Sequence, residues 1–216
     1  MKTPCIIIMR DRISHLRLCI ASLEESGAEL DIHIVDHGTT WEEALPFLNG
    51  SRYPVHFCGD QPPRSLWEWP GLAEIVGDRP YLVTDPDVVL DPDCPDDWLS
   101  QLADHLTHGA LVKAGLGLRL DDLPPTPLAA KAREWEQYFW AERAPEQAWR
   151  APVDTTLALY PPLSRQSGFA LSPAVRLDAP YLLRHLPWYG DLDPGETAYY
   201  RAHALPGTSH WINGGW

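Results

Sequence analysis

The sequence has few basic residues and no long apolar run, and each shortage argues against a class of protein. Lysine and arginine number 17 against 30 aspartate and glutamate residues, which gives a formal net charge of −13. Nucleic-acid binding needs many Lys and Arg side chains on one face, so no nucleic-acid partner is expected. No segment of about 20 apolar residues occurs, so no transmembrane segment is expected. A single small phosphorylated ligand stays compatible with this charge, because a metal ion can supply the positive charge.

Several enzyme motifs are also missing. The four cysteines are scattered and none has the C-x-x-C spacing of zinc or redox sites, so we expect reduced, buried thiols in a cytoplasmic protein. There is no G-x-S-x-G elbow, no Gly-rich loop ending in Lys-Ser or Lys-Thr, and no paired-histidine zinc motif. The apolar run at 5–9 is too short for a signal-peptide core. A cytoplasmic enzyme, soluble or peripheral to a membrane, is therefore the expectation.

The first half of the chain alternates between strand and helix patterns. Apolar runs at 5–9, 31–35, 54–57 and 80–84 predict buried strands. Helical spacing and cap residues predict helices at 12–25, at 66–76, and from Asp93 or Cys94 to about 108. Thr40 and Glu43 have the spacing of a capping box, which predicts a further helix. This alternation predicts an α/β fold with a Rossmann-like mixed sheet flanked by helices.

The second half is less regular. It predicts strands at 110–120 and 153–160, a helix at 128–142, irregular chain at 180–193 and a last helix from Asp193 or Pro194 to His203. The Gly115-Leu116-Gly117 segment predicts close backbone packing within a strand. No internal repeat is present, so a single domain over residues 1–216 is expected.

Six aspartates lie within residues 85–97, and two of them follow a predicted strand directly. Ligands of open α/β sheets bind outside the carboxyl ends of the strands, which is where Asp85 and Asp87 are expected. Two such carboxylates repel each other unless a cation lies between them. Mg²⁺ and Mn²⁺ take carboxylate, water and phosphate oxygens together, which suits a nucleoside diphosphate. The other four are expected to form turns and helix caps: Asp91, Asp93, Asp96 and Asp97.

These residues and others together resemble the metal-dependent glycosyltransferases of the GT-A fold, of the family-2-like type. The segments that carry the resemblance are Arg10-Asp11-Arg12 and residues 35–39, 83–87, 117–124, 153–160 and 184–189. A D-x-D pair alone occurs by chance in many chains, whereas the order and context of these segments are more specific. The resemblance covers most of the chain.

The resemblance implies transfer of a sugar, of the hexosyltransferase type, from a nucleotide-diphosphate donor to an acceptor hydroxyl. Uridine is the commonest base in similar enzymes, so a UDP-sugar is the expected donor, with Mn²⁺ or Mg²⁺ as the cofactor. The acceptor stays open among glycan, lipid, protein and small molecule, and so does the choice between inversion and retention. Residues 1–108 would bind the nucleotide sugar and metal, and residues 109–216 the acceptor.

The resemblance also implies roles for individual residues. The nucleotide would contact Met9, Arg10, Arg12, Asp36 and Asp85. The metal would be held by Asp85, Asp87 and a histidine, for which His203 is preferred over His210 and His185. His37 departs from the family pattern and is expected to be exposed.

Three carboxylates are candidates for the catalytic base of an inverting reaction. Asp154 belongs to a family-like segment, although a strand-end Asp also commonly bonds a backbone amide. Asp191 and Glu196 are alternatives, and Glu196 equally fits dipole complementation in the first turn of a helix. Trp188 and Tyr189 are expected to stack on a sugar or to form the acceptor wall.

Two other functions stay open. A sugar nucleotidyltransferase would carry a Gly-rich, basic loop after the first strand, whereas Arg10-Asp11-Arg12 contains no glycine. A non-catalytic carbohydrate- or nucleotide-binding domain derived from a transferase would not need the intact Asp85 and Asp87.

Overall fold

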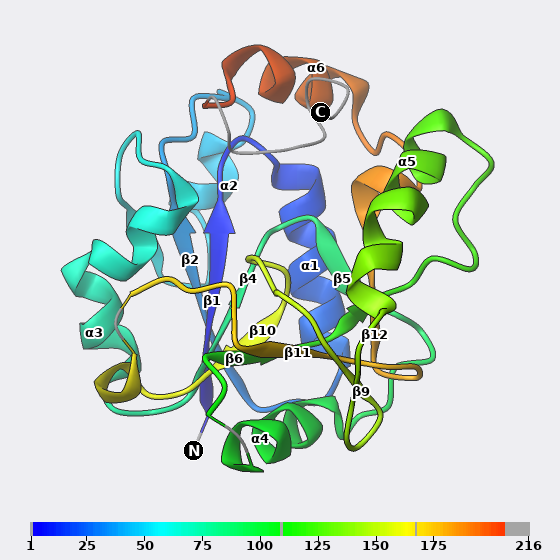
Figure 1. The fold of residues 1–216 in the computed structure, drawn as a ribbon. Helices are drawn as coiled ribbons and strands as arrows, with labels where there is room; N and C mark the ends of the chain where they lie inside the picture. The colour runs from blue at the N-terminus through cyan, green and yellow to red at the C-terminus, as the bar shows by residue number, and fades with distance from the viewer. Residues whose placement is uncertain (1, 109, 167, 206–216) are drawn as a thin grey trace.

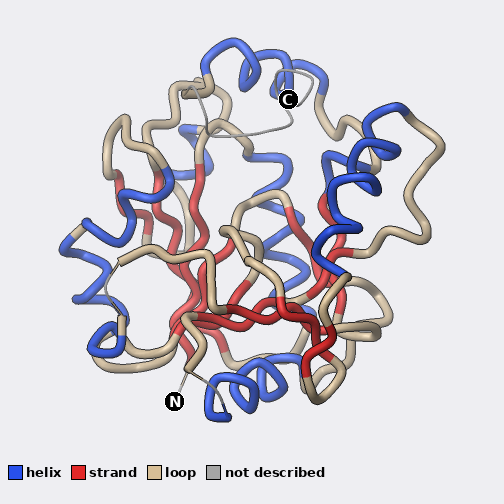
Figure 2. Tube along the Cα trace, viewed as in Figure 1, coloured by secondary structure: helices blue, strands red, loops and turns tan. Residues whose placement is uncertain are grey.

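A computed structural model describes residues 2–108, 110–166 and 168–205, and its main feature is a large mixed sheet with helices on both faces (Figures 1 and 2). The strand order is β3-β2-β1-β4-β10-β6-β11-β9-β8. Strands β3, β2, β1 and β4 run parallel, and β10 is antiparallel to both of its neighbours. A second sheet has the order β5-β12-β7. The predicted α/β class with a mixed sheet is confirmed.

The strands are β1 (Thr3–Met9), β2 (Leu30–Asp36), β3 (Val55–Phe57), β4 (Tyr81–Thr84), β5 (Val88–Leu90), β6 (Lys113–Gly115), β7 (Gly117–Leu118), β8 (Arg143–Ala144), β9 (Ala148–Arg150), β10 (Ala158–Tyr160), β11 (Ala174–Leu177) and β12 (Leu182–His185). The α-helices are α1 (Ile13–Glu25), α2 (Leu45–Asn49), α3 (Pro70–Val76), α4 (Trp98–His108), α5 (Pro127–Glu136) and α6 (Pro194–His203). Short 3-10 helices are η1 (Pro63–Glu68), η2 (Gln137–Trp140), η3 (Leu163–Arg165) and η4 (Leu186–Trp188). No described helix is both long enough and apolar enough to cross a bilayer.

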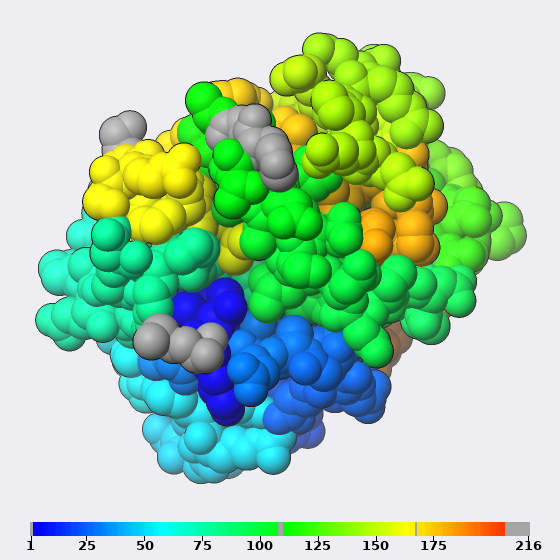
Figure 3. Space-filling model, turned by 90° about the horizontal axis from the view of Figure 1, so that it is seen from below, coloured from blue at the N-terminus to red at the C-terminus, as the bar shows by residue number. Residues whose placement is uncertain are grey.

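Strand β1 shows why the sequence begins with a continuous apolar run. Cys5, Ile7 and Met9 point into the core formed with α1 and α4, whereas Ile6 and Ile8 point into the core beneath η1 and α3. A strand covered on both faces needs apolar side chains at every position. Helix α4 lies across the end of the molecule at which β1 begins (Figures 1 and 3). A ligand would therefore reach the sheet at the opposite end, where β1 and its parallel neighbours end.

The first half follows the predicted order, with several corrections. The capping box predicted at Thr40 is wrong, because α2 begins at Leu45 and the Thr40 N–H donates to the Asp11 carboxylate. Helix α4 begins at Trp98, because the residues after Pro95 first form a turn. Strand β5 was not predicted.

The strand predicted at 110–120 is divided between the two sheets. Strand β6 pairs with β10 and β11 in the large sheet, whereas β7 pairs with β12 in the small one. A Cβ on Gly117 would lie 2.5 Å from the carbonyl oxygen of Leu177, so only glycine fits at this crossing. The close backbone packing predicted for this segment is confirmed.

The irregular chain predicted at 180–193 is wrong in part, because β12 lies within it between β5 and β7. The strand predicted at 153–160 is reduced to β10, and the β8–β9 hairpin was not predicted. Such short strands are stabilised by partners distant in sequence, which a local pattern does not reveal.

Candidate active site

A cavity of about 420 Å³ lies at the carboxyl ends of β1, β2 and β4. The first half of the chain contributes Met9, Arg10, Arg12, His37, Asp85 and Asp87 to its wall. The second half contributes residues of α5, the segment before β10, and β11, β12 and η4. Open α/β sheets bind their ligands at this end of the strands.

Asp85 follows β4 directly and lies on the cavity wall. Its Oδ2 accepts a hydrogen bond of 2.8 Å from the Thr155 hydroxyl, and its N–H donates to the Thr155 carbonyl. Burial, followed by the nearby charge of Asp87, raises the pKa of Asp85 to about 8. The site therefore favours a positive charge beside this carboxyl group.

Asp87 lies between two nitrogen-bearing side chains on the same wall. Its Oδ2 is 3.0 Å from Arg12 Nη1 and 3.6 Å from His185 Nε2. Burial opposes ionisation of Asp87, yet the pKa of Asp87 lies below the ordinary value, and the Arg12 guanidinium beside it contributes to this lowering. Burial lowers the pKa of His185 to about 4, so His185 faces Asp87 as a neutral imidazole.

These side chains fit a divalent cation that shares its coordination with a ligand. Within the described ranges, no group of three or more His, Cys, Asp or Glu side chains is placed to hold a metal by itself. Mg²⁺ is commonly held by one or two carboxylates and completes its coordination with substrate phosphates and water. Asp85 and Asp87 supply such a carboxylate pair beside a cavity.

Of the two candidate histidines that the structure describes, His185 is the one beside the carboxylate pair. His203 lies outside the cavity wall: its ring stacks on Tyr199 at 3.9 Å, and its Nδ1 lies 2.8 Å from the Tyr199 carbonyl oxygen. His210 lies outside the described residues. The structure therefore does not bring the preferred candidate, His203, to Asp85 and Asp87.

The loop after β1 places two arginines on the cavity wall, together with Met9. Asp11 between them has a left-handed backbone with φ 53°, and its buried carboxylate accepts the N–H groups of Thr40 and Trp41. Arg10 donates a hydrogen bond of 2.8 Å to the carbonyl of His37. The buried Asp11 thus fixes the turn that presents Arg10 and Arg12.

The residues at the carboxyl end of β2 differ from the expectation. The Asp36 carboxylate accepts the N–H and the hydroxyl of Thr39 and is absent from the cavity wall. His37, expected to be exposed, is 1% exposed and lies on that wall, which corrects the prediction. Its Nδ1 lies 3.3 Å from the Gln61 carbonyl oxygen. The sequence signal for this placement is that His37 closely follows the predicted strand at 31–35, where ligands of such sheets bind.

The three candidate bases lie in different surroundings. Asp154 is exposed on the wall of the main cavity, and in the described part of the chain its carboxylate forms no hydrogen bond or ion pair. Asp191 lines an adjoining hollow of about 260 Å³ and accepts a bond from the Thr197 hydroxyl. Glu196 lies on neither wall, because it is buried against the start of α1, where it accepts the Ser14 N–H. Only Asp154 is placed beside Asp85.

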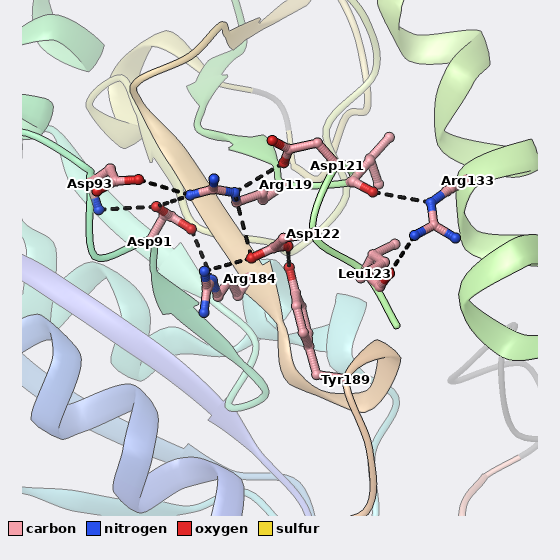
Figure 4. A network of polar contacts seen from close by, with 10 residues as sticks. Asp91, Asp93, Arg119, Asp121, Asp122, Leu123, Arg133, Arg184 and Tyr189 are labelled. Atoms are coloured by element: carbon pink, nitrogen blue, oxygen red, sulfur yellow. Dashed lines mark hydrogen bonds and ion pairs between the residues drawn. The ribbon is translucent and has the colours of Figure 1, made fainter. Parts of the chain in front are cut away.

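The two aromatic candidates are also separated. Trp188 is buried between the main cavity and the adjoining hollow, with its ring 4.5 Å from that of His185. Tyr189 instead donates its hydroxyl to Asp122 at 2.7 Å. Figure 4 shows this bond within a set that we call the arginine network: Asp91, Asp93, Arg119, Asp121, Asp122, Arg184 and Tyr189.

Other wall residues were not identified from the sequence. Arg176 donates a 2.6 Å ion-paired hydrogen bond to Glu136 and lies 4.1 Å over the ring of Phe139. Trp135 lies beside them on the same wall. The Arg176–Glu136 pair joins β11 to α5, and because the two residues are 40 positions apart no local sequence motif predicts it.

Comparison with known proteins gives a result at the level of the fold. No family model matches the chain, and no curated protein matches its sequence. The crystal structure of S. aureus TarS aligns over 94% of this chain and 39% of that chain, with 14% identity and a TM-score of 0.53. A TarS structure of residues 1–349 covers 94% of this chain and 64% of its own, with 11% identity and a TM-score of 0.49.

A third match is the galactosyltransferase LgtC in complex with donor and acceptor sugar analogues. It covers 74% of this chain and 58% of its own, with 14% identity and a TM-score of 0.40. The chain thus spans less than two thirds of the length of each of these solved chains. The mixed sheet and its similarity to TarS identify the architecture: this chain has a GT-A-type glycosyltransferase fold.

Proposed function

We propose that the protein is a glycosyltransferase that moves a hexosyl group from a nucleotide-diphosphate donor to an acceptor hydroxyl. One observation carries the proposal: Asp85 and Asp87 lie with Arg12 on the wall of a cavity at the carboxyl ends of parallel strands. Carboxylates beside an arginine suit a ligand that brings both a metal ion and a diphosphate.

The charge of the wall supports an anionic donor, although the whole chain is acidic. Four arginines from three separate segments reach the cavity: Arg10, Arg12, Arg64 and Arg176. In this proposal Met9, Arg10 and Arg12 would contact the nucleotide, and Asp85 and Asp87 would hold Mn²⁺ or Mg²⁺, with the His185 imidazole beside Asp87. A cation held there would supply positive charge beside the departing diphosphate. UDP is the first nucleotide to test.

Asp154 is the proposed base for an inverting transfer. The bond between the sugar carbon and the diphosphate oxygen breaks, and the leaving diphosphate keeps the electron pair. The acceptor oxygen forms the new bond to that carbon and gives its proton to Asp154. Trp135, Phe139 and Trp188 provide flat apolar surfaces on which an acceptor can rest.

The test is a panel of nucleotide sugars, assayed for donor hydrolysis and transfer with and without Mn²⁺. We expect metal-dependent release of a nucleoside diphosphate, with large losses in Asp87→Asn and Asp154→Asn. Asp93→Asn is the matched control, since Asp93 belongs to the arginine network and lies outside the cavity. Absence of metal-dependent nucleotide binding, with Asp87→Ala behaving as wild type, would refute the proposal.

Product analysis separates the transferase from the sugar nucleotidyltransferase alternative. A transferase releases a nucleoside diphosphate from a nucleotide sugar. A nucleotidyltransferase instead releases pyrophosphate when it is given a nucleoside triphosphate and a sugar phosphate. Pyrophosphate release would favour the alternative.

A further inference from the structure

Arg12 lies where the main cavity meets the adjoining hollow, and three contacts fix its side chain. Its Nη1 donates to Asp87 at 3.0 Å, its Nη2 lies 2.9 Å from His15 Nε2, and its guanidinium lies 4.9 Å over the Tyr200 ring. Arginine carries five N–H donors, and these hydrogen bonds use two of them. The remaining donors are available on a side chain that borders both hollows.

The contact with Arg12 determines which nitrogen of His15 carries the proton. Arginine only donates hydrogen bonds, so His15 Nε2 must accept, and the proton must be on Nδ1. Nδ1 lies 3.1 Å from Glu196 Oε1, which accepts it. Both residues are 1% exposed. A buried chain of contacts therefore runs from Glu196 through His15 to Arg12.

Glu196 is itself fixed from a second direction. Its Oε2 accepts the Ser14 N–H at 2.8 Å, and its Oε1 accepts the Ser14 hydroxyl at 2.6 Å. The N-cap residue of α1, Arg12, accepts no hydrogen bond from the first turn with its side chain. The Glu196 carboxylate of α6 takes that role by accepting the Ser14 N–H. The buried carboxylate holds both the helix end and the imidazole that orients Arg12.

We infer that Arg12 binds the diphosphate of the donor, and that the buried His15–Glu196 pair positions it for this contact. The inference rests on the proposed function and adds two positioning residues, neither of which lies on the wall of either hollow. A free arginine side chain loses considerable rotamer freedom when a ligand fixes it. Anchoring through His15 removes much of that loss before the donor arrives.

The first experiment measures binding of UDP, GDP, CDP, ADP and dTDP by calorimetry, in the presence of Mn²⁺, and compares each with its nucleoside. Arg12→Ala should weaken diphosphate binding about 10- to 100-fold, as expected for a lost charged hydrogen bond, and leave nucleoside binding unchanged. His15→Phe should weaken diphosphate binding about 5- to 10-fold. His15→Gln keeps an acceptor near the Nε2 position and should restore affinity to within about threefold.

Two matched controls test whether any loss is merely structural. His33→Gln replaces a histidine on β2 that contacts His56 and lies off the cavity wall. Glu24→Gln changes a carboxylate at the other end of α1, where Glu24 pairs with Arg52. Both should bind diphosphate as wild type does, whereas Glu196→Gln should weaken binding.

A second measurement does not depend on activity or on a ligand. The measurement is a ¹⁵N spectrum of the histidine rings, in which the signals missing from His15→Gln are assigned to His15. In wild type these signals should show the proton on Nδ1. Glu196→Gln should change them. The inference is overturned if Arg12→Ala binds a diphosphate as well as wild type does. It is overturned equally if His15→Phe and Glu196→Gln both bind the diphosphate as well as wild type does. It is also overturned if the His15 proton is on Nε2. Failure of wild type to bind any diphosphate would instead refute the proposed function.

Discussion

Aspartates from the single stretch 85–97 divide between two groups that meet different partners. In the arginine network, Arg119 contacts Asp91, Asp93 and Asp121, and Arg184 contacts Asp91 and Asp122 (Figure 4). At the cavity, Arg12 is the arginine that contacts Asp87, and Thr155 is the hydroxyl partner of Asp85.

The difference between the two groups lies in what surrounds their carboxylates. In the arginine network two guanidinium groups bridge four carboxylates, so the network joins β12 to the loops that follow β5 and β7. At the cavity one arginine faces two carboxylates that border a hollow, where a cation and its ligand can approach them. Placement beside a cavity, rather than acidity, separates the two groups.

The largest expected effect comes from the cavity pair. Asp87→Asn keeps the shape but removes the charge, and we expect donor turnover to fall about 10²- to 10³-fold, since metal ions contribute several kcal/mol to such transition states. Rates of nucleotide-sugar turnover with Mn²⁺ check this, with Asp93→Asn expected to stay within about twofold. Similar losses in both variants would show that the two groups do not differ in function.

The buried member of the arginine network should instead affect stability. Asp91 is 3% exposed and pairs with both arginines, so Asp91→Ala leaves two cations without their shared partner. We expect the free energy of unfolding to fall by about 3 kcal/mol, measured by urea denaturation. Below the transition, Mn²⁺-dependent nucleotide affinity should equal that of wild type. A loss of affinity in the folded variant would link the network to the site.

Lys113 provides a pH-dependent test, because it is a buried cation beneath the site. Its Nζ lies 3.0 Å from both the Asp154 carbonyl oxygen and the Tyr160 hydroxyl, and burial lowers its pKa to about 7. The unfolded chain holds this proton up to about pH 10.4, so above pH 7 the unfolded state binds more protons and stability rises with pH.

We therefore expect the unfolding free energy of wild type, relative to Lys113→Met, to rise by on the order of 2 kcal/mol from pH 6 to pH 9. Denaturation curves at several pH values measure it. Arg119→Met is the control from the arginine network, since arginine stays charged throughout, and its difference from wild type should not change with pH. An equally flat difference for Lys113→Met would show that Lys113 titrates normally.

The smallest effect is expected at the exposed edge of the arginine network. The side chain of Asp121 is 74% exposed, and exposed ion pairs contribute little. Asp121→Asn should change the free energy of unfolding by less than about 0.5 kcal/mol, and activity should be unchanged. A larger loss would mean that the network acts cooperatively.

Much of the fold could be predicted because its signals are local. The apolar runs of β1, β2 and β4 and the helical spacing of α1 are properties of neighbouring residues. Strands β5 and β12 and the β8–β9 hairpin could not be predicted, because residues far away in the chain pair with them or pack over them. For the same reason the predicted strand at 110–120 did not reveal its change of sheet.

Site residues divide in the same way. The position of Asp85 and Asp87 after β4 follows from the sequence, since strand ends define where ligands bind. That Tyr189 meets Asp122, that His37 is buried, and that Glu196 reaches α1 rather than a cavity depend on long-range packing. No spacing rule relates residues 182 positions apart, such as Ser14 and Glu196.

The sequence by itself determined an acidic α/β chain with an aspartate pair at a strand end, because strand and turn signals act over a few residues. The tertiary structure decided which carboxylates border a cavity and which meet arginines away from it, since these contacts depend on distances between segments remote in the chain. It also placed His185 rather than His203 beside Asp87, and a buried His15–Glu196 pair behind Arg12. The sequence shows which residue types are present, whereas tertiary packing determines which of them are in contact.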